Sequence, residues 1–482
     1  ASVAHVPSSD ALLGDGLERI VRGHHRRRLR RLGQAHRLDP PPGSAPWATG
    51  DPPPREGCAV EVLIDGAEAF PRVLDDIRAA RSHVHITGWH VTPDFALTRD
   101  GEASQLRRVL REAAERVDVR VLLWGGAPLR GFTPTRGEVK KVRDELERDS
   151  RAVCSLDPHE RTMHCHHEKL VVIDDEIAYV GGIDLTSLGG DRFDSSEHPE
   201  RGRLGWHDVA TRLQGPVVGD VARHIAARWG ENTGEVLPAV TDPPPAGASR
   251  VQLVRTVCEG MYDFAPQGDF RLLEAYVRAL RSAEHLIYLE NQFLWAPEIV
   301  EILAGKLRDP PSPGFRLVVL LPATPNTGAD DTQGQLQVLA AADRGERFLP
   351  CTINSRTGGR SGPLYVHAKV GIVDDRWLTV GSANLNAHSL FNDSEVNVVT
   401  DDAGLARATR LRLWAEHLEL PESEVAGPAA EVVDRRWRPV AEEQLARRRA
   451  DQVLTHRLMR LEGSSKRRER LRGPLQNLVV DG

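Results

Sequence analysis

Two short stretches of this 482-residue chain contain the same reactive side chains at the same spacing. The stretch from His367 to Glu395 contains His367, Lys369 and Asp374, then a turn of small residues ending in Asn384, and finally the carboxylate of Glu395. His367 and Lys369 are two residues apart, so in a strand they project from the same face of a sheet. An imidazole, an ammonium group and a carboxamide at neighbouring strand ends suit the binding of an anionic tetrahedral group.

The second stretch lies 200 residues earlier, and the offset is the same at every matching position. His167, Lys169 and Asp174 repeat the spacing HxKxxxxD. In the turn that follows, Gly182 and Asp184 take the places of Ser382 and Asn384. Asp208 is aligned with Glu395 by the segments that follow each of them. The sequence therefore predicts an internal duplication of roughly 200 residues.

Two such half-sites would meet across a pseudo-twofold axis as one pocket with two facing histidines. This arrangement suits displacement at a phosphodiester, with one imidazole attacking phosphorus and the other, protonated, giving its proton to the leaving alkoxide. Lys169, Lys369 and Asn384 would hold the non-bridging oxygens. A histidine nucleophile needs a carboxylate on its far nitrogen, and Glu395 and Asp208 are the candidates. No metal or other cofactor is required, because the lysines supply the positive charge.

The elements around these motifs alternate between strands and helices, which predicts an α/β fold. We expect two similar domains related by a pseudo-twofold axis, each a mixed sheet flanked by helices, with the site at their interface. Predicted strands cover 60–64, 83–89 and 119–124 in the first half and 251–254, 286–289 and 315–321 in the second. Between residue 124 and His167 we expect a charge-rich loop.

Composition shifts divide the chain into five parts. We expect a basic, proline-rich N-terminal segment at 1–55, the first half at 56–237, a linker at 238–249, the second half at 250–420, and a basic helical extension at 421–482. The prolines and alanines of the linker are typical of a boundary. The five cysteines are too few and too scattered for a disulfide framework. Cys165 stands among His164, His166 and His167, which we interpret as a strand entering the site and not as a metal site.

Charge is distributed unevenly along the chain. Residues 1–50 carry an excess of four positive charges and residues 435–472 an excess of eight, so the total of −6 leaves −17 on residues 51–434 when Asp481 is counted apart. Basic ends on an acidic body suit an anionic membrane surface. The alternative is a pair of solvated, arginine-rich helices. No apolar run reaches the roughly 20 residues that span a bilayer.

Both copies match the HxKxxxxD signature of the phospholipase D superfamily, and the second continues into GSxN and a late glutamate. HHEKLVVIDDEIAYVGGIDL, RFDSSEHP, WHDVATRLQGP and IYLENQFLW resemble the eukaryotic-type enzymes of that family, from about residue 59 to 420. The resemblance implies hydrolysis of phosphatidylcholine-type lipids to phosphatidate and exchange of the head group with alcohols, through a phosphohistidine. It implies that His167 is the nucleophile and His367 the general acid.

Further site residues follow from the same resemblance. Asp174 and Asp374 belong to the signature and are counted with the catalytic set, although the family suggests that they stabilise strand ends. Ser382 and Gly182 lie in the turns that face the phosphate. Asn291 and Gln292, with Glu290 before them, match a motif near the pocket or simply form a hydrogen-bonded strand end. Trp89 and Trp295 are candidates for the lipid entrance.

The sequence departs from the family at two places. Asp184 stands where the second copy has Asn384, so it cannot donate to phosphate unless it is protonated, and we expect an asymmetric pocket. The lipid-docking modules of larger relatives, including a calcium-binding one, have no counterpart, so calcium dependence through such a module is not expected.

Other functions of the superfamily remain open. A nuclease is disfavoured by the acidic body, and no nucleic-acid partner is expected. A cardiolipin or phosphatidylserine synthase is a second alternative, and a non-catalytic lipid-binding duplicate is a third. We expect a monomer that acts peripherally at a membrane or micelle surface, either secreted after loss of a signal or cytoplasmic.

Overall fold

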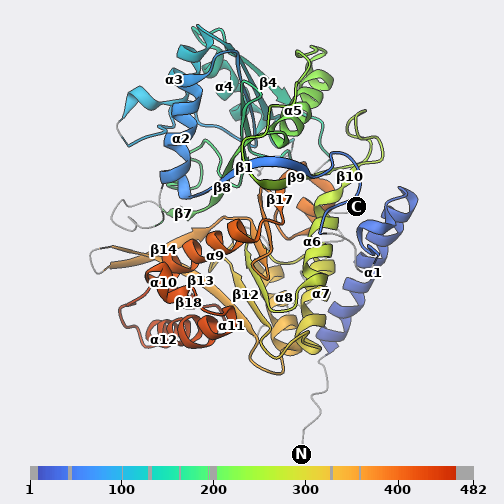
Figure 1. The fold of residues 1–482 in the computed structure, drawn as a ribbon, viewed down its shortest axis with the longest axis vertical. Helices are drawn as coiled ribbons and strands as arrows, with labels where there is room; N and C mark the ends of the chain where they lie inside the picture. Colours follow the sequence, from blue (N-terminus) through green and yellow to red (C-terminus); the bar gives the residue numbers. More distant parts are fainter. Residues whose placement is uncertain are drawn as a thin grey trace, which may run out of the picture.

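The structure is a computed structural model of the chain, and it describes residues 9–41, 46–99, 101–128, 133–161, 164–193, 195, 204–325, 329–357 and 360–462. The chain forms two α/β halves, the first above the second in Figure 1. Each half contains a mixed sheet with helices packed on it. The predicted fold class is confirmed.

The first half contains a seven-stranded sheet in the order β4-β3-β2-β5-β6-β8-β1. The pairs β2–β3 and β3–β4 are parallel and the other pairs are antiparallel. The strands of this half are β1 (Arg55–Ile64), β2 (His83–Gly88), β3 (Asp118–Trp124), β4 (Val153–Asp157), β5 (Leu170–Ile173), β6 (Ile177–Gly181), β7 (Gly205–His207) and β8 (Val209–Gln214).

The second half repeats this topology strand for strand, in the order β13-β12-β11-β15-β16-β17-β9. The pairs β11–β12 and β12–β13 are parallel and the others antiparallel, as in the first half. The strands are β9 (Ser249–Val257), β10 (Asp269–Phe270), β11 (Leu286–Glu290), β12 (Arg316–Leu320), β13 (Phe348–Thr357), β14 (Arg360–Val366), β15 (Val370–Val373), β16 (Trp377–Gly381), β17 (Glu395–Thr400) and β18 (Leu458–Arg460). The 200-residue repeat in the sequence is therefore a repeat of the fold.

The two sheets meet at their β1 and β9 edges. β1 pairs with β9 at Arg55 and Cys58, so the backbone hydrogen bonding continues from one half into the other. A second connection joins β7 to β14 in parallel, with Trp206 opposite Tyr365. These two seams fix the halves against each other and bring the paired motifs together.

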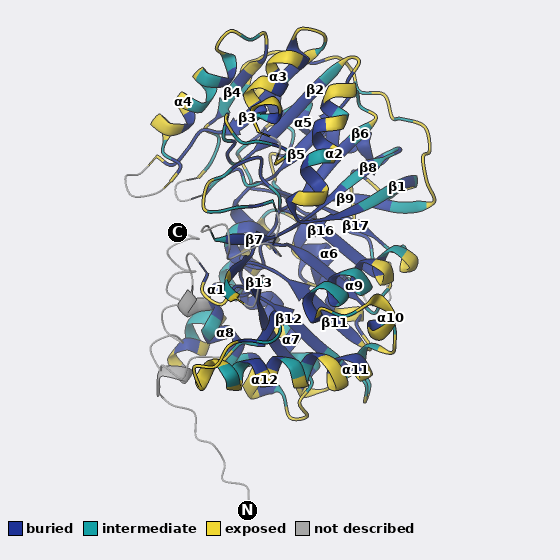
Figure 2. Cartoon of the chain, turned by 90° about the vertical axis from the view of Figure 1, so that its left-hand side faces the viewer, coloured by how far each residue is buried: buried dark blue, intermediate teal, exposed yellow. Residues whose placement is uncertain are grey.

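Equivalent helices follow equivalent strands in the two halves. The first half has α2 (Asp65–Ala79), α3 (Leu106–Ala114), α4 (Arg136–Glu147) and α5 (Val217–Thr233), with the short 3₁₀ turn η2 (Glu102–Ser104). The second half has α6 (Arg271–Ser282), α7 (Pro297–Arg308), α8 (Ala329–Ala342) and α9 (Ala403–Leu418), with the π-helical turn η3 (His388–Asn392). Figure 2 shows buried strands between helices whose outer faces are exposed.

The sequence pattern explains these elements. In α3, Leu106, Val109, Leu110 and Ala113 are buried, which is the spacing of one apolar helix face. In β5 and β15 every residue is buried, and both strands are continuous apolar runs covered on two sides.

One sequence prediction of local structure was wrong. The charge-rich stretch between residue 124 and His167, expected to be a loop, contains α4 and β4. Thr135 and Glu138 form a capping box at the start of α4, in which each side chain accepts from the other residue's backbone. The Thr-x-x-Glu pattern in the sequence indicates the start of a helix, although many charged residues surround it.

The described part of the N-terminal segment packs on the second half. The segment contains α1 (Ser9–Arg31) and the 3₁₀ turn η1 (Ala35–Arg37), and α1 lies beside α7. His25 bonds Glu298 at 2.6 Å, and Arg28 bonds Glu259 at 2.7 Å. Arg28 of α1 and Arg37 of η1 are buried, so the interpretation of α1 as a fully solvated basic helix is wrong for Arg28.

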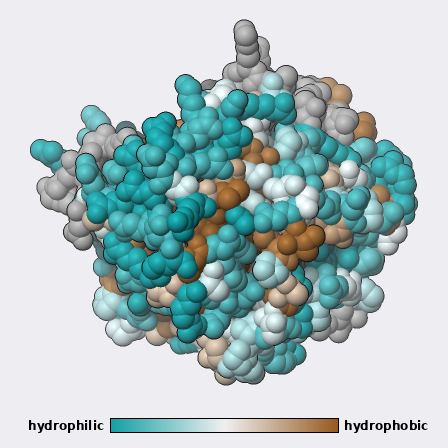
Figure 3. All heavy atoms as spheres, turned by 90° about the horizontal axis from the view of Figure 1, so that it is seen from above, coloured by the Kyte–Doolittle hydropathy of each residue, from teal (hydrophilic) through white to brown (hydrophobic). Residues whose placement is uncertain are grey.

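The C-terminal extension packs against the second half. It contains α10 (Glu422–Val425), α11 (Ala429–Val432), the π-helical turn η4 (Val433–Trp437) and α12 (Arg438–Arg449), and β18 adds to the edge strand β13. The basic residues expected at 466–472 lie outside the described residues. Among the helices of the described ranges, none combines the length and the apolar character needed to cross a bilayer. The face in Figure 3 is mostly hydrophilic, with hydrophobic residues in small groups.

Candidate active site

His167 lies immediately before β5 and is held by the second half. Its Nδ1 is 3.1 Å from Oε1 and 3.2 Å from Oε2 of Glu395, the first residue of β17. Its backbone N–H donates to the carbonyl oxygen of Ser394 at 2.9 Å. The imidazole is therefore oriented by a carboxylate that belongs to the other half, which leaves Nε2 for substrate.

His367 has the reciprocal arrangement. Its Nδ1 is 2.6 Å from Oδ2 of Asp208 in the first half, and its backbone N–H donates to the carbonyl oxygen of His207 at 2.8 Å. The rings of His167 and His367 face one another with centroids 6.4 Å apart and planes inclined by 65°. Each half thus supplies one histidine and the carboxylate that orients the other half's histidine.

The two carboxylates are supported in different ways. Ser382 and Ser389 donate to Oε2 and Oε1 of Glu395, both at 2.5 Å, so the longer side chain is held from two directions. At the position equivalent to Ser382, Gly182 leaves room for Asp208, because a Cβ there would lie 2.1 Å from Asp208 Oδ1. The shorter aspartate accepts from the backbone N–H of Val209 at 2.9 Å.

The two lysines of the site have different neighbours. Lys169 Nζ donates to the carbonyl oxygen of His167 at 2.6 Å and is 3.3 Å from Asp184 Oδ2. Lys369 Nζ donates to the carbonyl oxygen of His367 and lies 3.4 Å from Gln292 Oε1. The first half-site therefore contains an ion pair, whereas the second offers a lysine beside an amide.

Burial and charge set the ionisation of the second half-site. Burial, together with the charges of Lys369 and Arg192, lowers the pKa of His367 well below its ordinary value. Burial also raises the pKa of Asp208. Both shifts oppose a full Asp208–His367 ion pair in the empty site. Burial lowers the pKa of Lys369 to about 7, although Asp208 opposes the shift.

Asp184 remains a carboxylate. Burial alone would raise its pKa, but the charges of Lys169 and Arg192 outweigh burial and hold the pKa below its ordinary value. It therefore accepts from Lys169 and cannot donate to a phosphate. Asn384 is buried at the equivalent position, so the asymmetry expected from the sequence is present in the structure.

Asp174 and Asp374, counted with the catalytic set from the sequence, lie at the opposite end of β5 and β15 from the lysines. Four residues of strand correspond to about 13 Å. Asp174 accepts from the backbone N–H groups of residues 81–83 at 2.7–3.0 Å. Asp374 accepts from those of residues 284–286 at 2.6–2.8 Å. The structure corrects their placement: they fix the starts of β2 and β11.

The Glu290–Gln292 motif divides into three roles. Glu290 is buried and bonds the Nε2 atoms of His207 and His417, each at 2.8 Å. Asn291 Oδ1 accepts from two backbone N–H groups at 3.1 Å, which is the strand-end alternative. Gln292 is the member that approaches Lys369, and its Nε2 donates to the Tyr365 hydroxyl at 2.8 Å.

The two tryptophans proposed for the lipid entrance contact other aromatic rings. Trp89 is half-buried and stacks on Trp124. Trp295 is buried and meets His388 edge-on with centroids 5.6 Å apart.

The sequence did not single out several residues that contact the site. Trp206 packs on His367 with centroids 4.7 Å apart, and Arg192 lies over the Trp206 ring at 3.7 Å. Tyr365 supports Gln292, and Ser389 supports Glu395. Ser389 carried no motif signal. A buried carboxylate needs hydrogen-bond donors, and this was the one physical reason to expect a residue such as Ser389 beside Glu395.

Comparisons with known proteins agree with this geometry. The family model described as phospholipase D matches residues 76–205, and the one described as cardiolipin synthase, PLD-like domain, matches residues 276–416. One match therefore falls on each half. The chain belongs to the phospholipase D superfamily.

Curated relatives of the superfamily are longer than this chain. Phospholipase D A of Dictyostelium discoideum is 26% identical over 76% of this chain and 36% of its own length. Phospholipase D2 of Bos taurus is 25% identical over 73% of this chain and 50% of its own length. The chain thus spans between a third and a half of these two relatives.

A solved structure resembles most of the fold. The phosphatidylserine synthase of Haemophilus influenzae Rd KW20 has a TM-score of 0.51 at 14% identity, covering 81% of this chain and 93% of its own. The likeness supports the two-domain superfamily fold.

Proposed function

We propose that the chain is a phospholipase D that hydrolyses phosphatidylcholine-type lipids to phosphatidate and free head group and transfers the phosphatidyl group to alcohols. The observation that carries the proposal is the crossed pair His167–Glu395 and His367–Asp208 on facing sides of one site. Such a pair supplies a nucleophile and an acid at the same phosphorus.

In the first step, His167 Nε2 attacks phosphorus and a P–N bond forms. The bond from phosphorus to the head-group oxygen breaks, and protonated His367, held at Nδ1 by Asp208, gives its Nε2 proton to that oxygen. Glu395 stabilises the positive charge that develops on His167. In the second step, His367 removes a proton from water or an alcohol, whose oxygen displaces His167 and forms phosphatidate or a new phosphodiester.

The lysines and Asn384 would bind the non-bridging oxygens. Lys169 is shared with Asp184, so the stronger attraction for the phosphate comes from Lys369 once it is protonated. An anionic phosphate favours the protonated forms of Lys369 and His367. Substrate binding thus gives His367 the proton that it later donates, although the empty site holds this proton weakly.

The test is head-group release from phosphatidylcholine vesicles in the presence of 1-butanol, with His167→Ala and His367→Ala as comparisons. Phosphatidylbutanol and choline formed by wild type, with losses of at least a thousandfold in both variants, would support the proposal. A lack of turnover on choline and ethanolamine lipids by folded wild type would contradict it.

A phosphatidyltransferase is the second candidate, because the second half matches the cardiolipin synthase domain model. The two candidates differ in the donor that they accept. Incubation with CDP-diacylglycerol and serine would release cytidine monophosphate from a transferase that uses this donor, and incubation with phosphatidylglycerol would yield cardiolipin and glycerol from one that joins two phosphatidyl groups. A nuclease would instead hydrolyse bis(p-nitrophenyl) phosphate and DNA while leaving vesicles intact.

A further inference from the structure

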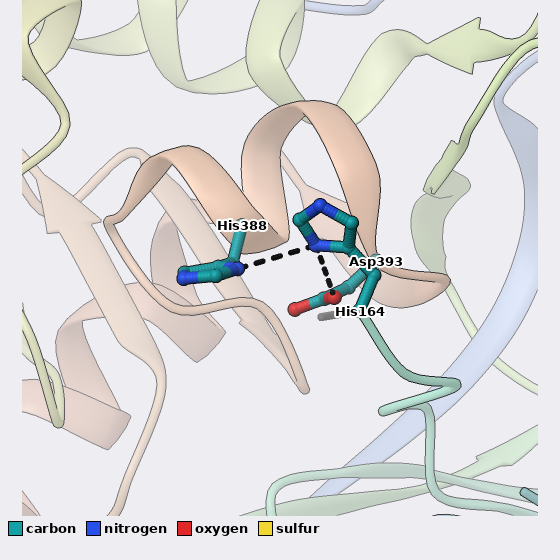
Figure 4. A group of neighbouring side chains, drawn as sticks. All are labelled: His164, His388 and Asp393. Carbon is teal, nitrogen blue, oxygen red and sulfur yellow. Dashed lines mark hydrogen bonds and ion pairs between the residues drawn. The ribbon is translucent and has the colours of Figure 1, made fainter. Parts of the chain in front are cut away.

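A group of metal-binding side chains lies between the two halves beside the active site. His164 comes from the first half, three residues before His167. In the second half, His388 is the first residue of the π-helical turn η3, and Asp393 follows the last residue of this turn. Figure 4 shows the three side chains directed towards one another. Nδ1 of His388 is 3.2 Å from Nδ1 of His164, which is 3.3 Å from Asp393 Oδ1.

These separations are those of ligands around one small cation. Zinc binds imidazole nitrogen and carboxylate oxygen at about 2.0–2.2 Å in tetrahedral geometry, so two of its ligand atoms are about 3.3 Å apart. The ligand atoms of all three residues lie within 4.8 Å of one another. Two histidines and one carboxylate are also a donor set that zinc accepts, with a water in the fourth position.

The surroundings would hold these ligands in place. Asp393 Oδ1 accepts from the backbone N–H of Cys165 at 3.0 Å, and the backbone N–H of Asp393 donates to the carbonyl oxygen of His388 at 2.8 Å. Trp295 meets the His388 ring edge-on at 88°. His164 and Asp393 are buried and His388 is partly exposed, which gives an ion a route from solvent.

A second group of histidines and carboxylates in the described chain is linked by direct hydrogen bonds. His207 Nδ1 bonds Asp65 at 3.0 Å, its Nε2 bonds Glu290 at 2.8 Å, and the other oxygen of Glu290 bonds His417 at 2.8 Å. All of these residues are buried. Both nitrogens of His207 and both oxygens of Glu290 are bonded within this group, so we do not assign it an ion.

We propose that His164, His388 and Asp393 bind one zinc ion that joins the two halves. The ion would act by joining the two halves, and its three ligands are positioning residues. Because His164 precedes His167 by three residues and Asp393 precedes Glu395 by two, the ion would fix the segment that carries His167 against the start of β17, which carries Glu395. From the sequence alone, His164 is interpreted as part of a strand that enters the site. Its two partners in the cluster are more than 200 residues away in the sequence, so no local motif indicates them.

The experiment measures metal binding directly and does not depend on catalysis. The full chain is stripped with a chelator, dialysed against 10 μM Zn²⁺, and its metal content is measured by mass spectrometry. Wild type should hold one zinc per chain, whereas His388→Ala and Asp393→Asn should each lose at least tenfold in zinc affinity. The matched control is His285→Ala, whose ring is exposed, and it should bind as wild type does.

Two further measurements test the zinc site. Co²⁺ in place of zinc should give the intense visible bands of tetrahedral coordination in wild type and lose them in His388→Ala. Zinc should raise the Tm of wild type but not of His388→Ala, with circular dichroism showing that both are folded. Wild type that holds no zinc at 10 μM, or zinc affinity equal in wild type and in folded His388→Ala, would overturn the proposal.

Discussion

Gly182 lies against the carboxylate of Asp208 so closely that a Cβ at this position would be 2.1 Å from Oδ1. The equivalent residue of the second half, Ser382, instead donates a hydrogen bond to Glu395. The two half-sites therefore pair a short carboxylate with a glycine and a long one with a serine. The choice of residue at each position follows from the length of the acid that it faces.

The first prediction exchanges this feature. Gly182→Ser should displace the Asp208 carboxylate from His367 and lower kcat/KM at least tenfold, or about 1.4 kcal/mol. The measurement is head-group release from vesicles. Gly137→Ala in α4 is the matched control, since a Cβ there meets nothing within 4 Å. Activity of Gly182→Ser equal to that of the control would contradict a tight Gly182–Asp208 contact.

The second prediction concerns Lys369, whose pKa burial lowers to about 7. Its ammonium form is present below pH 7 and is lost as pH rises, so an anion of fixed charge should bind more weakly towards pH 8.5. Dimethyl phosphate keeps one negative charge over this range, and its Kd can be followed by calorimetry. Lys369→Arg keeps its charge and should show no such decline. Parallel pH profiles for the two proteins would refute the assignment.

The same shift has a consequence for stability. The unfolded chain holds a lysine proton up to about pH 10.4, whereas the folded chain releases it near 7. Between these values the unfolded state binds more protons than the folded state. The free energy of unfolding therefore increases with pH through the contribution of Lys369, and the folded state becomes more stable. Against Lys369→Met, which has no such proton, wild type should gain relative stability from pH 7 to 9.5 in urea unfolding.

The sequence was sufficient to predict the duplication and the two histidine–lysine pairs, because the offset of 200 residues is constant and strand geometry places His and Lys on one face. It was not sufficient to predict which carboxylate serves which histidine. Glu395 follows His367 by 28 residues, yet it bonds His167, because β17 starts beside the first half. Asp174 was grouped with the site because it belongs to a short motif, although a strand separates it from the lysine.

The third prediction tests the support of Glu395. Ser389→Ala removes a 2.5 Å hydrogen bond to a buried carboxylate, a loss of about 1.5–3 kcal/mol for a charged partner. If Ser389 positions Glu395, kcat should fall roughly tenfold or more while KM changes little. Ser312→Ala, at a surface turn, is the control. A fall in Tm with unchanged kcat would instead indicate a purely structural role.

The fourth prediction separates the signature aspartates from the chemistry. Asp374→Asn keeps the shape of the side chain but weakens three bonds from backbone N–H groups at the start of β11. The free energy of unfolding should fall by about 1–3 kcal/mol. At a temperature where the variant is fully folded, kcat should stay within threefold of wild type. A thousandfold loss of kcat in the folded variant would restore Asp374 to the catalytic set.

The last prediction concerns membrane docking by α1. Arg28 is buried in contacts with the second half, but Arg26, Arg27, Arg30 and Arg31 are exposed. Basic residues near an anionic surface contribute about 1 kcal/mol each to binding.

If this face docks the enzyme, changing these four arginines to glutamate should abolish binding to vesicles with 30% phosphatidylserine. Turnover of a soluble, short-chain substrate should be unchanged, because the exposed arginines lie on the outer face of α1. The control for net charge changes four exposed arginines of the first half, Arg72, Arg107, Arg108 and Arg151, to glutamate, and it should retain binding. Equal vesicle binding by wild type and the glutamate variant would remove α1 as the dock.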